Sequence, residues 1–172
     1  MVSARGPRRA RARAGARHPQ GAAARDGVDG LAAGRHRAGV LQGAGLLAHY
    51  RFADWAEPPA RRVARLVERR LDARGRFRAV GQSTSGLGGD LLLRVGLDEL
   101  FHDASTEPGV ARLALDADLI DWRARTRLAR RRFERSEALT SADAAGAAAA
   151  LSRALTAALD ELAPWVESAA AD

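Results

Sequence analysis

The sequence predicts an α+β protein, within the wider α/β class, in which a mostly antiparallel sheet of about four to five strands carries two amphipathic helices on one face. Apolar and polar residues alternate in three stretches between residues 90 and 137, which is typical of half-buried strands. Apolar residues recur every three or four positions in 60–71 and 144–166, which is typical of one helix face. Turn-forming residues separate these stretches, so the predicted order is β-α-β-β-β-β-α.

The first predicted unit is a strand followed by a proline-rich turn, within residues 49–80. Tyr50 and Phe52 alternate with polar neighbours, as expected of a half-buried strand. Pro58 and Pro59 cannot donate to a sheet, but proline suits the first turn of a helix, where the N–H has no partner. The unit therefore predicts a strand, a turn and then a helix that begins near residue 60.

That helix has one apolar and one charged face. Gly75 follows it where a left-handed C-cap residue belongs, and 77–80 begins a further short strand. The residues of the apolar face are Val63, Leu66, Val67 and Leu71.

The next part of the chain predicts a meander of three strands. Residues 90–102 and 110–122 alternate over similar lengths and are joined by a short turn, so they are expected to pair antiparallel. Residues 128–137 form the third strand, with Phe133 as its core residue. The loop at 81–89 is rich in glycine and serine but has no lysine, so it predicts a connector and not a phosphate-binding loop.

The last predicted element is an alanine-rich helix over 144–163. Thr140 and Asp143 form a weak capping pattern before it. Pro164 is expected to bend or end the helix near Leu162, and residues 168–172 are expected to fray. The helix carries an apolar stripe of Ala148, Leu151, Leu155, Leu159, Leu162 and Val166.

The charge of the chain is concentrated in its first residues. The 172 residues have a net charge of +7, with no lysine and no cysteine. Residues 1–42 hold nine arginines and two aspartates, whereas 43–172 hold nineteen arginines and nineteen acidic residues. Because residues 1–39 have few large apolar side chains, we expect a disordered extension there and a domain over 40–167. The extension is interpreted as non-native residues from an early start or shifted frame, or as a basic arm for nucleic acid.

No catalytic or metal-binding pattern is present in the sequence. The four histidines lack ligand spacing, no serine has a histidine and an acid arranged as a triad, and no cofactor motif occurs. His102, at a strand end near acidic residues, is expected to be solvated. Asp116 and Asp118 are expected to pair with Arg94 or Arg130 across the sheet. The sequence therefore predicts no enzyme, no metal site and no cofactor.

The candidate site is an aromatic and proline cluster at the end of the first strand and in the turn after it. Two interpretations remain open: its rings anchor the helix onto the sheet, or Trp55 and the turn form part of a partner-binding surface. The candidate partner-binding residues are Tyr50, Phe52, Trp55, Pro58 and Pro59.

The run LLAHYRFADWAEPPARRVARLVERRLDARGRFRAV resembles the ABC-type transport auxiliary lipoprotein family. The tyrosine strand, the W-A-x-P-P turn and the G-R-F-x-x-V strand carry the resemblance, which continues through DLLLRVGLDELFHD and the final helix over about residues 40–167. The family pattern also has a secretory signal and a lipidated cysteine, which this sequence lacks. That departure indicates a wrong start or reading frame, or a copy that has lost its anchor.

The resemblance implies a non-enzymatic accessory of an ABC-type lipid or organic-solvent transport system of the MCE, Mla or Pqi kind. The implied location is the periplasm, in association with the outer membrane. The implied partners are an MCE-type channel component and the permease and ATPase complex, with phospholipid and a second copy of the chain as further candidates. The alternative from a different class is a nucleic-acid-binding protein that acts through its basic arm.

Overall fold

The computed structural model describes residues 2–7, 37–42, 46–85 and 88–171 of the chain. From the third strand onward the element order is strand, helix, four strands and helix, so the predicted order and the α+β class are confirmed. The elements are β1 (Val2–Pro7), β2 (Arg37–Gln42), β3 (Leu46–Asp54), α1 (Pro59–Ala73), β4 (Phe77–Gly81), β5 (Leu91–Asp103), β6 (Val110–Asp121), β7 (Thr126–Ala138) and α2 (Ala144–Ala169), with a 3₁₀ turn at Ser83–Ser85.

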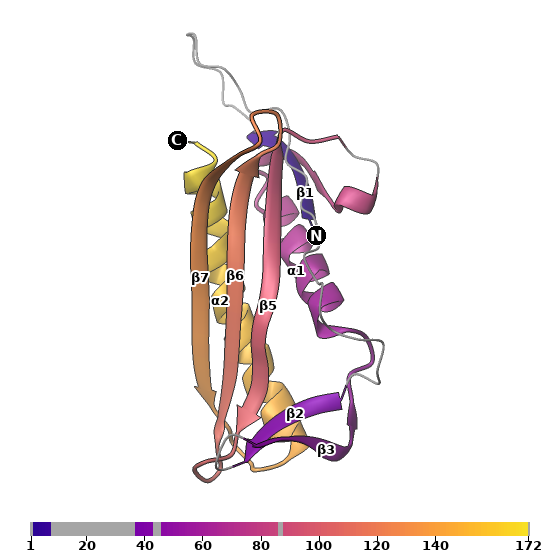
Figure 1. The fold of residues 1–172 in the computed structure, drawn as a ribbon, viewed down its shortest axis with the longest axis vertical. Coiled ribbons are helices and arrows are strands. Elements are labelled where there is room, and N and C mark those ends of the chain that lie inside the picture. Colours follow the sequence, from indigo (N-terminus) through magenta and orange to yellow (C-terminus); the bar gives the residue numbers. More distant parts are fainter. Residues whose placement is uncertain (1, 8–36, 43–45, 86–87, 172) are drawn as a thin grey trace.

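The long strand β5 organises the sheet (Figure 1). Along one edge it pairs antiparallel with β6, which in turn pairs antiparallel with β7, so the predicted meander is confirmed. Its other edge is shared between two strands: β1 pairs antiparallel with the start of β5, and β2 pairs parallel with its end. The pairs β1–β4 and β2–β3 therefore extend the sheet at opposite ends of β5.

Part of the N-terminal segment belongs to the sheet. We expected a disordered extension over 1–39, but β1 and part of β2 lie within that range and raise the strand number of the sheet to seven. The side chains of β1 gave no strand signal because small and charged residues dominate it, and its pairing rests on backbone hydrogen bonds with β4 and β5. Residues 8–36 lie outside the described residues, so the prediction for them stays a prediction.

Both helices cover the same face of the sheet, as predicted, and their apolar stripes form most of the core beneath them (Figure 1). Val67 and Leu71 of α1 are at most 1% exposed, and α1 ends before Gly75, which has the expected positive φ of 61°. Phe133 is 1% exposed and meets the Trp165 ring edge to face, with centroids 5.6 Å apart. The predicted core role of Phe133 is therefore confirmed.

Helix α2 is longer than the sequence predicts. Asp143 is its N-cap residue, and its carboxylate accepts a hydrogen bond of 2.7 Å from the Gly146 N–H. Pro164 does not end the helix, because α2 continues through it to Ala169. Leu162 and Val166 on either side of Pro164 are buried, and this packing outweighs the lost backbone hydrogen bond, which costs about 3 kcal/mol in a helix interior.

An ion pair joins the ends of the two helices. The Arg74 guanidinium, just after α1, donates two hydrogen bonds to the Glu167 carboxylate of α2, of which the Nη2–Oε2 bond measures 2.8 Å. The Glu167 side chain is 13% exposed. The hydrogen bond from Arg74 lowers the pKa of Glu167 below its ordinary value of 4.5, against the opposing effect of desolvation. The charged form of Glu167 is therefore stabilised by folding.

Replacing Glu167 with glutamine is expected to lower the free energy of unfolding by about 1 kcal/mol at neutral pH. Because the folded pKa is lowered, the stabilisation by Glu167 is present above the unfolded pKa and is lost as the pH falls through the folded pKa. Urea unfolding at pH 7 and pH 3 measures the difference, which should shrink at the lower pH. Glu107→Gln, in an exposed turn, is the matched control. An equal loss of stability for Glu167→Gln at both pH values would contradict the pairing.

A candidate binding groove between the two helices

The turn before α1 is held by one carboxylate. Glu57 accepts hydrogen bonds of 2.5 and 2.6 Å from Arg65 and one of 3.3 Å from Arg62. Desolvation acts to raise the pKa of Glu57, but the hydrogen bond from Arg62 and the charge of Arg65 outweigh it, so the pKa lies below its ordinary value. These contacts tie the turn to the first two turns of α1, where Pro58 is the N-cap residue and has no side-chain cap.

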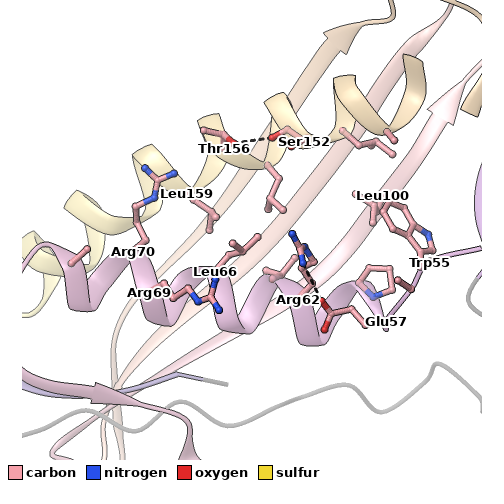
Figure 2. Close-up of a pocket in the computed structure, with 17 residues that line it drawn as sticks. Trp55, Glu57, Arg62, Leu66, Arg69, Arg70, Leu100, Ser152, Thr156 and Leu159 are labelled. Atoms are coloured by element: carbon pink, nitrogen blue, oxygen red, sulfur yellow. Dashed lines mark hydrogen bonds and ion pairs between the residues drawn. The ribbon is translucent and has the colours of Figure 1, made fainter. Parts of the chain in front are cut away.

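A groove of about 590 Å³ lies between α1 and α2 (Figure 2). Its volume falls in the range of about 300–1,000 Å³ that is usual for ligand sites. Trp55 closes the end near the turn, and Leu100 of β5 lies beside it (Figure 2). The α1 wall includes Arg62, Val63, Leu66, Arg69 and Arg70. The α2 wall includes Leu151, Ser152, Leu155, Thr156 and Leu159.

The groove is lined by the parts of both helix stripes that the sheet does not cover. Val63 and Leu159 are at most 4% exposed and form its base. Leu66 and Leu155 are only half-buried and pack against the core from the side of the groove. Apolar surface thus stays open to a ligand at positions that the sequence assigned to the core.

The two walls of the groove differ in charge. The α1 wall carries three arginines, of which Arg62 is paired with Glu57, and Arg70 with Asp160 across the helices. No acidic group among the described residues forms an ion pair with Arg69, which is exposed. The α2 wall is neutral, because none of its lining residues is ionisable. The Thr156 hydroxyl donates a 2.9 Å hydrogen bond to the Ser152 carbonyl oxygen (Figure 2).

The structure brings only part of the predicted cluster to this groove. Trp55 and Pro59 line it, whereas Pro58 lies beside it in the turn and is half-buried. Tyr50 and Phe52 are in β3, but their side chains lie outside the described part of the structure.

Trp55 also packs against a small core cluster formed around Ala111 and Leu151. The Trp55 ring is therefore compatible with both interpretations of the sequence, because it contacts the core and also lines the groove. Which of the two its function depends on stays a prediction.

The groove residues that sequence reasoning missed are the arginines of α1 and the polar positions of α2. Arg62 and Arg69 belong to the charged face predicted for the first helix, and Ser152 and Thr156 were given no role. The available signal was the spacing between Arg62, Leu66 and Arg69, which places charge directly beside the apolar stripe.

His102 is buried, with 3% exposure, so the prediction of a solvated residue is wrong. A β-bulge at Asp98 shifts the alternation: Leu97 pairs with Leu115, but Leu100 pairs with Leu113. After the bulge, His102 lies opposite Ala111 on the covered face. Its Nε2 lies 3.2 Å from the Pro108 carbonyl oxygen, within the hairpin turn. Within the described residues, no group of three or more His, Asp or Glu side chains is arranged to hold a metal ion.

The open face of the meander carries paired charges. Arg132 contacts Asp98 at 2.5 Å, Glu134 at 2.6 Å and Asp116 at 3.1 Å, and the hydrogen bonds that it donates to Glu134 and Asp98 raise its pKa. Arg130 lies 3.9 Å from Asp116 and 4.0 Å from Asp118, which confirms the predicted cross-strand pairing for this arginine.

Arg94 lies opposite Asp118 in the sheet register, without an ion pair within the described residues. Apart from Arg94, the arginines of this face that are named above are paired with carboxylates, in contrast to the apolar groove on the covered side.

Comparison with known proteins assigns the family. A family model described as "ABC-type transport auxiliary lipoprotein component" matches residues 36–163. The chain therefore belongs to the ABC-type transport auxiliary lipoprotein component family. The family's description associates it with an ABC-type transport system. The predicted resemblance is confirmed.

Solved structures share the fold. The protein XCC0632 from Xanthomonas campestris, of the family DUF330, is 26% identical, with a TM-score of 0.72, over 78% of this chain and 76% of that one. An uncharacterised protein has a TM-score of 0.63 at 13% identity, over 86% of this chain and 89% of that one. No curated protein matches the chain. Neither helix in the described part of the chain is long and apolar enough to span a membrane.

Proposed function

We propose that this chain is a non-enzymatic accessory of an ABC-type system that transports lipids or organic solvents in the cell envelope. It acts in the periplasm at the outer membrane and works by binding: it holds the MCE-type component of the transporter, the outer membrane, or both. ATP hydrolysis belongs to another subunit of the system. The family match over residues 36–163 is the observation that carries this proposal.

The groove between α1 and α2 supports a binding role. Leu66 and Leu155 line the groove, are partly exposed and pack against the core. A partner that covers them would remove apolar surface from water without reorganising the fold. Tryptophan and arginine are the residue types that most often dominate binding energy, and Trp55 and Arg69 supply both at the groove. We therefore place the partner surface at the groove and the turn that closes it.

Replacing Trp55 with alanine is expected to reduce capture of the purified MCE-type component by about tenfold or more, since buried tryptophans are frequent binding hot spots. The midpoint of thermal unfolding should stay near the wild-type value, because the ring is only partly buried in the free protein. Pull-down of the two purified proteins and a thermal melt by circular dichroism give the two measurements.

Trp122→Ala is the matched control, because Trp122 is also half-buried but does not line the groove. Capture by that variant should equal capture by the wild type. A large loss of folded Trp55→Ala protein would assign the ring to the core. Unchanged capture by a folded Trp55→Ala protein would move the partner surface away from the turn.

A further inference from the structure

The cationic side chains of the groove lie along the α1 wall, and the Glu57 carboxylate lies beside Arg62 at the end near the turn. Arg62 and Arg69 both line it from α1 and are seven residues apart, which corresponds to about 10 Å along the helix axis. The facing α2 wall offers Ser152 and Thr156, which are neutral. An amphiphile with one anionic head would need its cationic partners at one end, so the groove favours a ligand with acidic groups at intervals of about 10 Å.

An α-helix has the right dimensions for this groove. The lining residues of α2 run from Ala148 to Leu159, which spans about 16 Å, or three helical turns. Acidic residues at positions i and i+7 of a helix lie on one flank and about 10 Å apart, which matches the spacing of Arg62 and Arg69. Apolar residues at i, i+3, i+4 and i+7 would then face Leu66 and Leu155.

Both arginines can bind a carboxylate of a partner. Arg69 has no ion pair within the described residues, and the side chain of Arg62 is 62% exposed although it contacts Glu57. A guanidinium has five N–H donors, so Arg62 can bind a further carboxylate without releasing Glu57. Residues 8–36 of this chain make a poor occupant, since they hold seven arginines and two aspartates and would place like charges beside the α1 wall.

We propose that the groove between α1 and α2 binds one amphipathic helix of a partner protein, with its apolar stripe in the groove and acidic residues on the flank that faces α1. This inference goes beyond the proposed function, because it names the kind of segment that is recognised whichever protein supplies it.

Two stapled helical peptides of about three turns test the proposal. They carry the same leucine stripe and differ only in one flank, which has glutamate at i and i+7 in one peptide and lysine in the other. Binding to the full-length protein is measured by fluorescence anisotropy. The glutamate peptide is expected to bind at least tenfold more tightly than the lysine peptide. The double variant Arg62→Glu/Arg69→Glu is expected to reverse that order.

Two further variants keep the test specific. Arg61→Glu changes the same charge on an exposed position of α1 that does not line the groove, so both affinities should stay unchanged. Leu155→Asp should abolish binding of the glutamate peptide while circular dichroism shows a folded protein.

Three results would overturn the proposal. The first is equal affinity for the two peptides, and the second is an order that Arg62→Glu/Arg69→Glu leaves unreversed. The third is binding of dodecyl phosphate at one molecule per chain, lost in Leu155→Asp, by a protein that binds neither peptide. That third result would assign the groove to a single-chain anionic amphiphile.

Discussion

Replacing Phe133 with alanine is expected to lower the free energy of unfolding by about 3–5 kcal/mol, the usual cost of removing a buried aromatic ring. Phe133 is 1% exposed and is packed on three sides: by Leu115 on the neighbouring strand, by the Trp165 ring and by the Arg131 guanidinium, 5.1 Å from its ring centroid. The cavity left by alanine lies where β6, β7 and α2 meet. Urea unfolding measures the loss.

Leu128→Ala is the control for this prediction, because Leu128 is on the same strand but is 46% exposed. Its effect should lie within about 0.5 kcal/mol of zero. The free energy of unfolding of a typical domain is about 5–15 kcal/mol, so the loss expected for Phe133→Ala is a substantial part of the total. A loss for Phe133→Ala as small as that for Leu128→Ala would show that α2 does not seal the meander as described.

Replacing Gly109 with alanine is expected to lower the free energy of unfolding by about 2–5 kcal/mol, from backbone strain and steric overlap together. Gly109 has a φ of 101°, which L-residues rarely adopt. An added Cβ would lie 2.0 Å from His102 Nε2 and 2.8 Å from the Asp103 carbonyl oxygen. The carbonyl oxygen of Gly109 also accepts a 3.0 Å hydrogen bond from the Leu139 N–H, so strain here reaches the segment that leads to α2.

A second variant separates the two causes. In His102→Ala/Gly109→Ala the closest overlap is removed, but the positive φ and the contact with Asp103 remain, so the two substitutions should not be additive. Gly88→Ala is the control, since its Cβ would meet no atom within 4 Å. Chemical unfolding of the wild type, His102→Ala, Gly109→Ala and the double variant measures the cycle. A Gly109→Ala protein as stable as Gly88→Ala would contradict the close contact between the turn and His102.

The sequence predicts those parts of the fold in which local pattern and burial agree. Phe133 lies between two charged neighbours and is buried on the covered face, and Val67 and Leu162 lie in helical stripes that are buried in the same core. In these segments the side-chain period alone determines which face turns inward. The positive φ of Gly75 follows from the same logic, because a helix end there requires a residue without a Cβ.

Other features depend on contacts between distant residues and have no local signal. The bulge at Asp98 places His102 inside, although nothing beside it in the sequence marks the shift. Pro164 remains within α2 because burial of Leu162 and Val166 outweighs the local preference to stop. The strand β1 is formed by backbone pairing with β4 and β5, which its own side chains do not indicate.

The groove was only half predictable for a related reason. Trp55 and Pro59 were singled out as unusual residues in a turn, and both line it. Its second wall comes from α2, about 90 residues later in the chain. Leu66 and Leu155 reach the same opening only because both helices pack on the same face of the sheet. A stripe on a single helix cannot show which of its residues the rest of the protein will cover.

The central claim is that this protein acts by holding a component of the transporter, and the most direct measurement is sedimentation velocity on the two purified wild-type proteins. The account predicts that a mixture of this chain with the MCE-type component sediments as one complex of fixed stoichiometry, at micromolar concentrations. Two species that sediment independently, while circular dichroism shows that both are folded, would contradict it.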